Sequence, residues 1–167
     1  MTVKTIHKDA ERLAMTITAE FDAPVERVWQ LWDDPRQLEQ WWGPPEWPAT
    51  VVDHDLTPDG RINYYMTGPE GEKAHGWWRV VKVDPPRHLE FEDGFALDLG
   101  VPNPEMPVMT IRVTLEEEAA GTRMAIETTF PSRAAMDQML EMQMDEGMAA
   151  AMGQMDDIIR ATPTPGA

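Results

Sequence analysis

The sequence predicts a single α+β domain in which an antiparallel sheet packs against a long C-terminal helix. Three observations support this fold class. Apolar and polar residues alternate with a period of two between residues 50 and 130, two short segments before them have helical spacing, and a long helical segment follows. A chain of 167 residues has the length of one domain and can remove roughly 70% of its unfolded surface from water.

The domain is expected to span residues 14–160, after an N-terminal lead of residues 1–13. It opens with a strand over residues 15–21, where apolar and polar side chains alternate. Two short helices follow, and Pro24 and Pro35 each fit the first helical position, where the missing N–H would be unpaired anyway. Asp34 can cap the second helix, and Gln37 stands three residues later in the arrangement of a capping box.

These two helices carry an unusual concentration of tryptophan. Four of them fall within fourteen positions, and helical spacing turns them inward: Trp29, Trp32, Trp41 and Trp42. Glu26, Arg27, Gln30 and Asp33 occupy the outward face of the first helix. So much apolar mass exceeds what two surface helices need, which predicts that the cluster closes one end of a thick or hollow core.

The central part of the chain reads as an antiparallel meander, which brings the sheet to about seven strands. The further strands are expected over residues 50–56, 61–67, 76–83, 88–93, 108–115 and 123–130. One apolar face combines Ile62, Tyr64, Met66, Leu89, Phe91, Met109, Ile111, Val113, Leu115, Met124, Ile126, Thr128 and Phe130. In the strand over residues 76–83 both the odd and the even positions carry apolar residues, so the alternation does not decide which side of this strand is buried.

A long helix over residues 133–160 is expected to cover the apolar face. Ser132 can cap its start, Pro163 lies beyond its end, and its length would be about 40 Å. Its inward stripe reads Met136, Leu140, Met144, Gly147, Ala151, Met155 and Ile158. Gly147 and Gly153 weaken the helix by up to about 1 kcal/mol each and permit a bend or a close approach to the sheet. Residues 161–167 are expected to be a disordered tail.

Charge and composition exclude several function classes. Thirty acidic residues against fourteen basic ones give a net charge of −16, so nucleic acid and anionic membrane surfaces are not expected as partners. The chain has no cysteine, which excludes disulfides and thiolate chemistry. The sequence shows neither a signal peptide nor an apolar run long enough for membrane insertion, so a cytoplasmic location is expected.

The candidate chemistry of the chain is sparse. His54 shares the parity of Val52 and Leu56, which is expected to face the interior, so it could act as a general acid/base or orient a ligand. A histidine at the core edge that bonds to the backbone is the alternative. No ligand spacing for a metal and no phosphate-binding loop is present, so no cofactor is expected.

Six motifs of the sequence resemble the activator of heat-shock protein 90 ATPase-like family, which belongs to the START/SRPBCC superfamily. They are APVERVW (23–29), WWGP (41–44), HDLTPDGR (54–61), MTGPEGE (66–72), VDPPRHLEF (83–91) and EGM (146–148). The resemblance covers about residues 14–160 and implies the helix-grip fold, in which a curved sheet wraps the C-terminal helix and leaves a cavity. Two departures are Asp59, where the family often has glycine, and an insert over 94–107 that could contribute to a pocket rim.

The superfamily resemblance implies several possible activities. The favoured hypothesis is non-catalytic binding of an apolar or aromatic small molecule between sheet and helix, in a carrier, sensor or stress-related role. The expected ligand contacts are Trp41, His54, Tyr64, Trp78, Phe91, Ile111, Met136, Leu140 and Met144. Methionine adapts to varied shapes and suits both core filling and such a binding wall. The alternatives are an enzyme of the cyclase, dehydratase or hydrolase type that uses His54 with Tyr64 or a carboxylate, and a surface-acting regulator of a chaperone ATPase. A homodimer is also possible.

Overall fold

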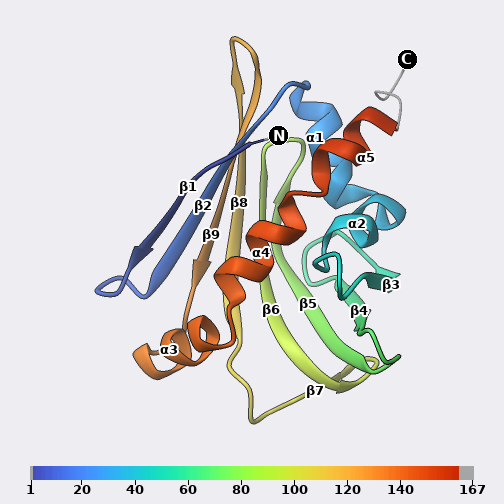
Figure 1. The fold of residues 1–167 in the computed structure, drawn as a ribbon, viewed down its shortest axis with the longest axis vertical. Coiled ribbons are helices and arrows are strands. Elements are labelled where there is room, and N and C mark those ends of the chain that lie inside the picture. The colour runs from blue at the N-terminus through green and yellow to red at the C-terminus, as the bar shows by residue number, and fades with distance from the viewer. Residues whose placement is uncertain (1, 162–167) are drawn as a thin grey trace.

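The computed structural model describes residues 2–161, in which one antiparallel sheet curves around a C-terminal helical segment (Figure 1). The sheet has nine strands among these residues, in the order β1-β2-β9-β8-β6-β5-β4-β3, with β7 paired to β6. Their bounds are β1 (Thr2–Asp9), β2 (Ala14–Phe21), β3 (Ala49–His54), β4 (Arg61–Thr67), β5 (Lys73–Asp84), β6 (His88–Asp98), β7 (Val101–Pro102), β8 (Met109–Glu118) and β9 (Gly121–Thr129). The helices are α1 (Val25–Asp33), α2 (Pro35–Trp41), α3 (Arg133–Glu141), α4 (Met144–Met152) and α5 (Met155–Ala161).

The segment expected as an N-terminal lead contains a strand. Strand β1 pairs antiparallel with β2 and forms one edge of the sheet. The Lys8 ammonium lies 2.7 Å from a carboxylate oxygen of Asp145, which ties this edge to α4 and lowers the pKa of Asp145. The strand was missed because Thr5, Ile6, His7 and Lys8 are all exposed, so this stretch shows no one-sided burial.

The apolar face predicted from the alternation is the inner face of the sheet. Its apolar residues join one buried cluster, with Met66 partly buried at the margin, and Thr128 is buried beside them. The facing of β5 is also decided, because Trp78 and Val80 are fully buried in that cluster while Val81 is exposed. Trp77 lies outside the cluster, where the guanidinium carbon of Arg61 sits 5.6 Å from its ring centroid.

Strand β3 corrects one expectation of facing. Val52 was expected to point inward with His54, yet it is 47% exposed. The register between β3 and β4 shifts between Val51 and Asp53, so a bulge breaks the alternation that the sequence indicated. His54 is therefore only half-buried, at the edge of the core.

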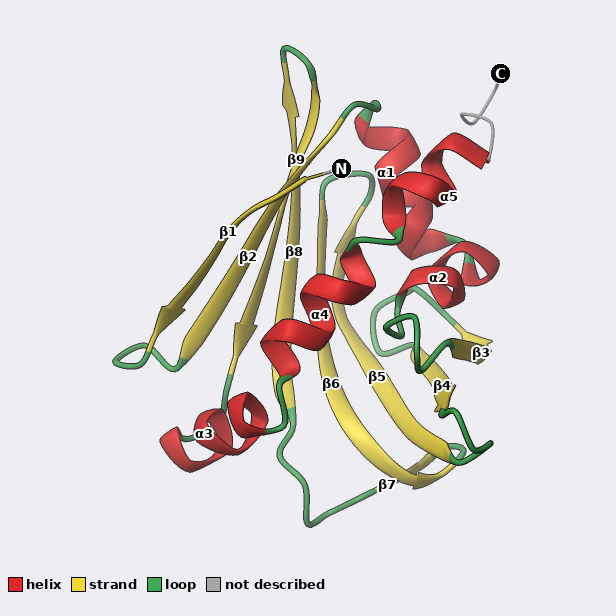
Figure 2. Cartoon of the chain, in the orientation of Figure 1, coloured by secondary structure: helices red, strands yellow, loops and turns green. Residues whose placement is uncertain are grey.

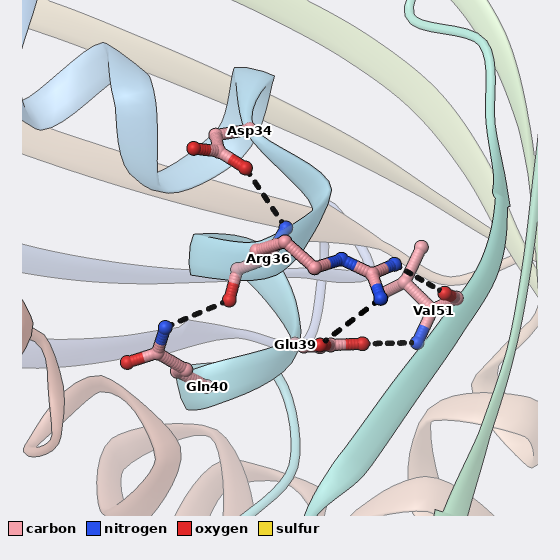
Figure 3. A network of polar contacts seen from close by, with 5 residues as sticks. All are labelled: Asp34, Arg36, Glu39, Gln40 and Val51. Atoms are coloured by element: carbon pink, nitrogen blue, oxygen red, sulfur yellow. Dashed lines mark hydrogen bonds and ion pairs between the residues drawn. The ribbon is translucent and has the colours of Figure 1, made fainter.

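Helix α2 protects the free edge of β3 through side chains (Figure 3). Arg36 Nη2 donates to the Val51 carbonyl at 2.8 Å, and Glu39 Oε1 accepts from the Val51 N–H at 2.9 Å. Arg36 and Glu39 also lie 3.5 Å apart as an ion pair. An edge strand otherwise offers unpaired backbone groups to other chains, so this pair blocks strand addition at that position.

Arg27 is the buried charge of the helical layer. It was expected on the outward face of α1, but only 1% of it is exposed. Its guanidinium donates to Gln37 Oε1 at 2.8 Å and to the Ile158 carbonyl at 2.9 Å, because α5 packs over α1. Gln37 in turn donates to the Asp34 carboxylate at 3.0 Å, in place of the backbone contact of a capping box. Arg27 thus joins α1, α2 and α5.

An Arg27→Ala variant is expected to lose about 2–4 kcal/mol of unfolding free energy, because the Gln37 oxygen and the Ile158 carbonyl lose a buried donor. Chemical denaturation measures the change. Glu26→Ala, at an exposed position of the same helix, is the control and should cost less than about 0.5 kcal/mol. Equal costs for the two variants would contradict the bridging role.

The C-terminal helical segment crosses the concave face of the sheet in three pieces rather than as one rod. Gln143 has a left-handed backbone (φ 62°) between α3 and α4, and Gly153 caps the end of α4. Figure 2 shows α4 in front of the central strands and α5 beside α1. Ser132 accepts from the Ala135 N–H as the expected cap. Residues 162–167 of the expected tail lie outside the described residues, and Ala161 ends α5.

Asp59, the first departure from the family pattern, has a backbone conformation that glycine would favour. Its φ of 66° lies in the left-handed region that favours glycine. The Asp59 carboxylate accepts a hydrogen bond from Arg79 Nη1 at 2.9 Å. A residue with a carboxylate is thus accommodated at a position where the turn geometry alone favours glycine.

Candidate functional site

A pocket of about 280 Å³ lies between α4 and the inner face of the sheet near β4, β5 and β6. Methionine and aromatic side chains dominate its wall. The lining residues are Trp42, Pro44, Tyr64, Met66, Ala74, His75, Gly76, Asp93, Gly94, Phe95, Met109, Met139, Met142, Gln143, Met144, Gly147 and Met148. The segment with left-handed Gln143 and the start of α4 form the helical side of the wall.

Tyr64 and Asp93 form a polar pair in this apolar wall. The Tyr64 hydroxyl donates to Asp93 Oδ1 at 3.1 Å, from neighbouring inner-face positions of β4 and β6 on either side of β5. Burial raises the pKa of Asp93 to about 7, and the hydrogen bond from Tyr64 only partly offsets this effect. Burial, followed by the charge of Asp93, raises the pKa of Tyr64 well above its usual range. Near neutral pH Tyr64 therefore keeps its hydroxyl proton, while the Asp93 carboxyl is partly protonated.

Gly76 allows the Tyr64 ring to reach this position. A Cβ atom at residue 76 would lie 2.4 Å from the Tyr64 hydroxyl oxygen, so any side chain there would displace the ring. The Trp42 ring meets the Tyr64 ring edge-on with centroids 6.0 Å apart. The indole N–H groups of Trp42 and Trp78 lie near enough to the Tyr64 oxygen to favour its ionised form without making a hydrogen bond. The pair is thus fixed by packing.

Two of the nine predicted ligand contacts, Tyr64 and Met144, line the pocket. Leu140 packs partly buried against the core. The Nε2 atom of His54 lies 3.0 Å from the Trp32 carbonyl, which is the backbone-bonded alternative considered for it. The remaining predicted contacts are fully or almost fully buried away from the pocket wall: Trp41, Trp78, Phe91, Ile111 and Met136. These residues build the core instead.

An aromatic cluster explains why those residues are not available to a ligand. The Trp78 and Phe91 rings stack with centroids 3.8 Å apart, and Trp42 meets Trp78 edge-on at 4.8 Å. Trp41 packs edge-on against Trp32 at 4.7 Å and donates its indole N–H to the Leu31 carbonyl. The tryptophans therefore fill one end of the sheet, and the space that remains lies next to Trp42.

Asp93 is a buried carboxylate of the pocket wall that the sequence analysis missed. It follows Leu89 and Phe91 at the same inward parity of β6, so the sequence did contain a signal, namely a carboxylate at a core-facing strand position. The expected insert over 94–107 contributes as well. Strand β6 continues through its first residues, and Gly94 and Phe95 line the pocket.

Two further features are absent from the described part of the chain. Over residues 2–161, no group of three or more His, Asp or Glu side chains is arranged to hold a metal ion. Within the same range no helix combines the length and the apolar character that a bilayer crossing requires.

Comparison with known proteins identifies the family of this chain. A family model described as Activator of Hsp90 ATPase homolog 1-like protein matches residues 22–160. The chain belongs to this family. No curated protein matches the chain at a significant level. Membership of the Hsp90 ATPase activator-like family suggests a ligand-binding or regulatory role.

Solved structures agree with the assignment to the Hsp90 ATPase activator-like family. A protein from Arthrobacter aurescens is 50% identical with a TM-score of 0.92, over 98% of this chain and 95% of that chain. A protein from Mycobacterium smegmatis is 48% identical with a TM-score of 0.87, over 97% of this chain and 99% of that chain. The AHSA1 protein from Silicibacter pomeroyi, at 21% identity and a TM-score of 0.70 over 89% of this chain and 98% of that one, shares the fold. The expected helix-grip architecture is confirmed, with more strands than expected.

Proposed function

We propose that this protein binds an apolar or aromatic small molecule in the pocket between α4 and the sheet. The observation that carries the proposal is the pocket itself, whose methionine and aromatic wall contains one buried hydrogen-bonded pair, Tyr64 and Asp93. Ligand sites in proteins typically combine a mostly apolar wall with a few fixed polar groups. Burial of apolar ligand surface supplies about 25 cal/mol per Å² before ordering costs.

The glycine at position 147 is a second observation in favour of an open pocket. It lies inside α4, where glycine is about 1 kcal/mol less favourable than alanine, and it lines the pocket. A Cβ atom at this position would meet nothing within 4 Å, so no steric clash requires glycine there. A larger residue would instead project into the pocket. The helix thus forgoes stability at a position that lines the pocket and where a side chain would occupy part of the space.

Gly147 also provides the test of the proposal. Gly147→Phe should fill the pocket and abolish binding of a neutral probe such as 4-phenylbutanol, measured by calorimetry and by native mass spectrometry. Gly147→Ala is the matched control, expected to raise the unfolding free energy by up to about 1 kcal/mol and to retain binding. If wild-type protein binds no neutral apolar probe, or if Gly147→Phe binds as well as Gly147→Ala, the proposed function is wrong.

A second candidate function rests on Asp93. A carboxyl group with a pKa of about 7, hydrogen-bonded to Tyr64 in a pocket, has the properties of a general acid/base. An enzyme of the cyclase or dehydratase type would then use Asp93 in place of His54, which bonds to the backbone. Turnover of any bound polyketide-like substrate should disappear in Asp93→Asn and follow a pKa near 7 in the wild type. Turnover that persists in Asp93→Asn excludes this candidate.

A further inference from the structure

We propose that the natural ligand of this pocket carries a protonated amine that pairs with the Asp93 carboxylate. The inference rests on the proposed function and names the chemical class of the ligand, an amphiphilic or aromatic ammonium compound.

Asp93 has one oxygen available to a ligand. Its Oδ1 accepts from the Tyr64 hydroxyl at 3.1 Å, while Oδ2 has no hydrogen bond among residues 2–161. Oδ2 keeps some exposed surface. Asp93 lines the pocket although only 8% of the residue is exposed. The unpartnered oxygen therefore faces the space that a ligand would occupy.

The charges around the pocket favour a cation. No lysine or arginine lines it, and no basic side chain of the described residues forms an ion pair with Asp93. The other titratable lining groups are Tyr64 and His75, and His75 Nε2 lies 3.8 Å from Asp98 rather than from Asp93. A buried carboxylate without a counter-charge is costly, and a ligand ammonium would supply the missing partner. An anionic ligand would face repulsion there, in a chain of net charge −16.

The wall suits the rest of such a ligand. Trp42, Tyr64 and Phe95 bring aromatic rings to the pocket, and cations bind favourably to the faces of aromatic rings. Methionine thioethers from the sheet and from α3 and α4 surround the remaining space and adapt to an aryl or alkyl body. An ammonium group at Asp93 with an apolar remainder along α4 satisfies both parts of the wall.

A matched series of probes tests the inference: 4-phenylbutylamine, 4-phenylbutanol and 4-phenylbutanoate. They share one apolar body and are cationic, neutral and anionic at pH 8, where Asp93 with its pKa of about 7 is mostly ionised. Calorimetry in about 150 mM salt suppresses attraction to the acidic surface. We expect the amine to bind wild type about ten-fold more tightly than the alcohol, and the carboxylate to bind most weakly. In Asp93→Asn the ratio of amine to alcohol affinity should fall to about one.

The outcomes separate the two proposals. If the alcohol binds in a manner that Gly147→Phe abolishes but the amine has no advantage, the amine inference is overturned and the proposed function stands. An amine advantage that persists in Asp93→Asn or in Gly147→Phe reflects surface charge and also overturns the inference. If none of the three probes binds wild type, both proposals fail.

Discussion

A Phe91→Ala variant is expected to lose about 3–5 kcal/mol of unfolding free energy, the largest effect of any substitution considered for this protein. Phe91 is fully buried, stacks on Trp78 and lies with its ring centroid 6.2 Å from that of Trp32. Its removal leaves a cavity in the middle of the aromatic cluster, where large rigid rings cannot collapse into the space. Urea denaturation monitored by tryptophan fluorescence measures the loss.

Phe91→Leu is the control for that experiment. It keeps most of the apolar volume and should cost less than half as much as the alanine variant, about 1–2 kcal/mol. Ligand binding should survive in Phe91→Leu because Phe91 does not line the pocket. A Phe91→Ala variant with wild-type stability would mean that the cluster is loosely packed and that the division into filled core and open pocket is wrong.

The second large effect is a change in the pH dependence of stability in Asp93→Asn. Burial raises the folded-state pKa of Asp93 from 3.8 to about 7, so the folded state binds more protons than the unfolded state between these values. The contribution of Asp93 to the unfolding free energy is therefore fully present below about pH 4 and is lost as the pH rises through about 7. Asparagine can still accept the Tyr64 hydrogen bond but carries no charge. The variant should be more stable than wild type by about 2–4 kcal/mol at pH 8, and nearly equal to it at pH 4.

The difference between wild type and Asp93→Asn isolates this residue from the general repulsion of a highly acidic chain. Both proteins share all other carboxylates, so the common pH dependence cancels in the difference. Asp98→Asn, at an exposed position of the same strand, is a matched control that removes one charge outside the pocket. A stability difference for Asp93→Asn that does not change with pH would contradict the raised pKa.

Much of the fold could be predicted because it depends on local patterns. Strict alternation identified the inner face of β4, β6, β8 and β9, since one-sided burial in a sheet requires a period of two. Ser132 and Asp34 were recognisable as caps from their side-chain chemistry. Where the backbone departs from regular geometry, prediction failed, as at the bulge after Val51 and at left-handed Gln143.

The pocket was harder to predict than the fold because its position depends on how large side chains share the interior. The sequence indicated that Tyr64 and Met144 face inward, and both line the pocket. It could not distinguish them from Trp78 and Phe91, which face the same interior but stack against each other. Edge strand β1 was missed although its partner β2 follows it directly, because residues 5–8 are exposed and its ion pair with α4 joins residues distant in sequence.

Methyl NMR of methionine-labelled protein tests the central claim, that the space between α4 and the sheet admits an apolar guest. The pocket and the core both contain methionines, so the protein carries its own internal controls. On addition of 4-phenylbutanol we expect shifts of the methyl signals of Met66, Met109, Met139, Met144 and Met148, which line the pocket. Core methyls such as those of Met15 and Met124 should stay in place, and Gly147→Phe should abolish every shift. A spectrum that does not change, or shifts scattered over core and surface alike, would contradict the account.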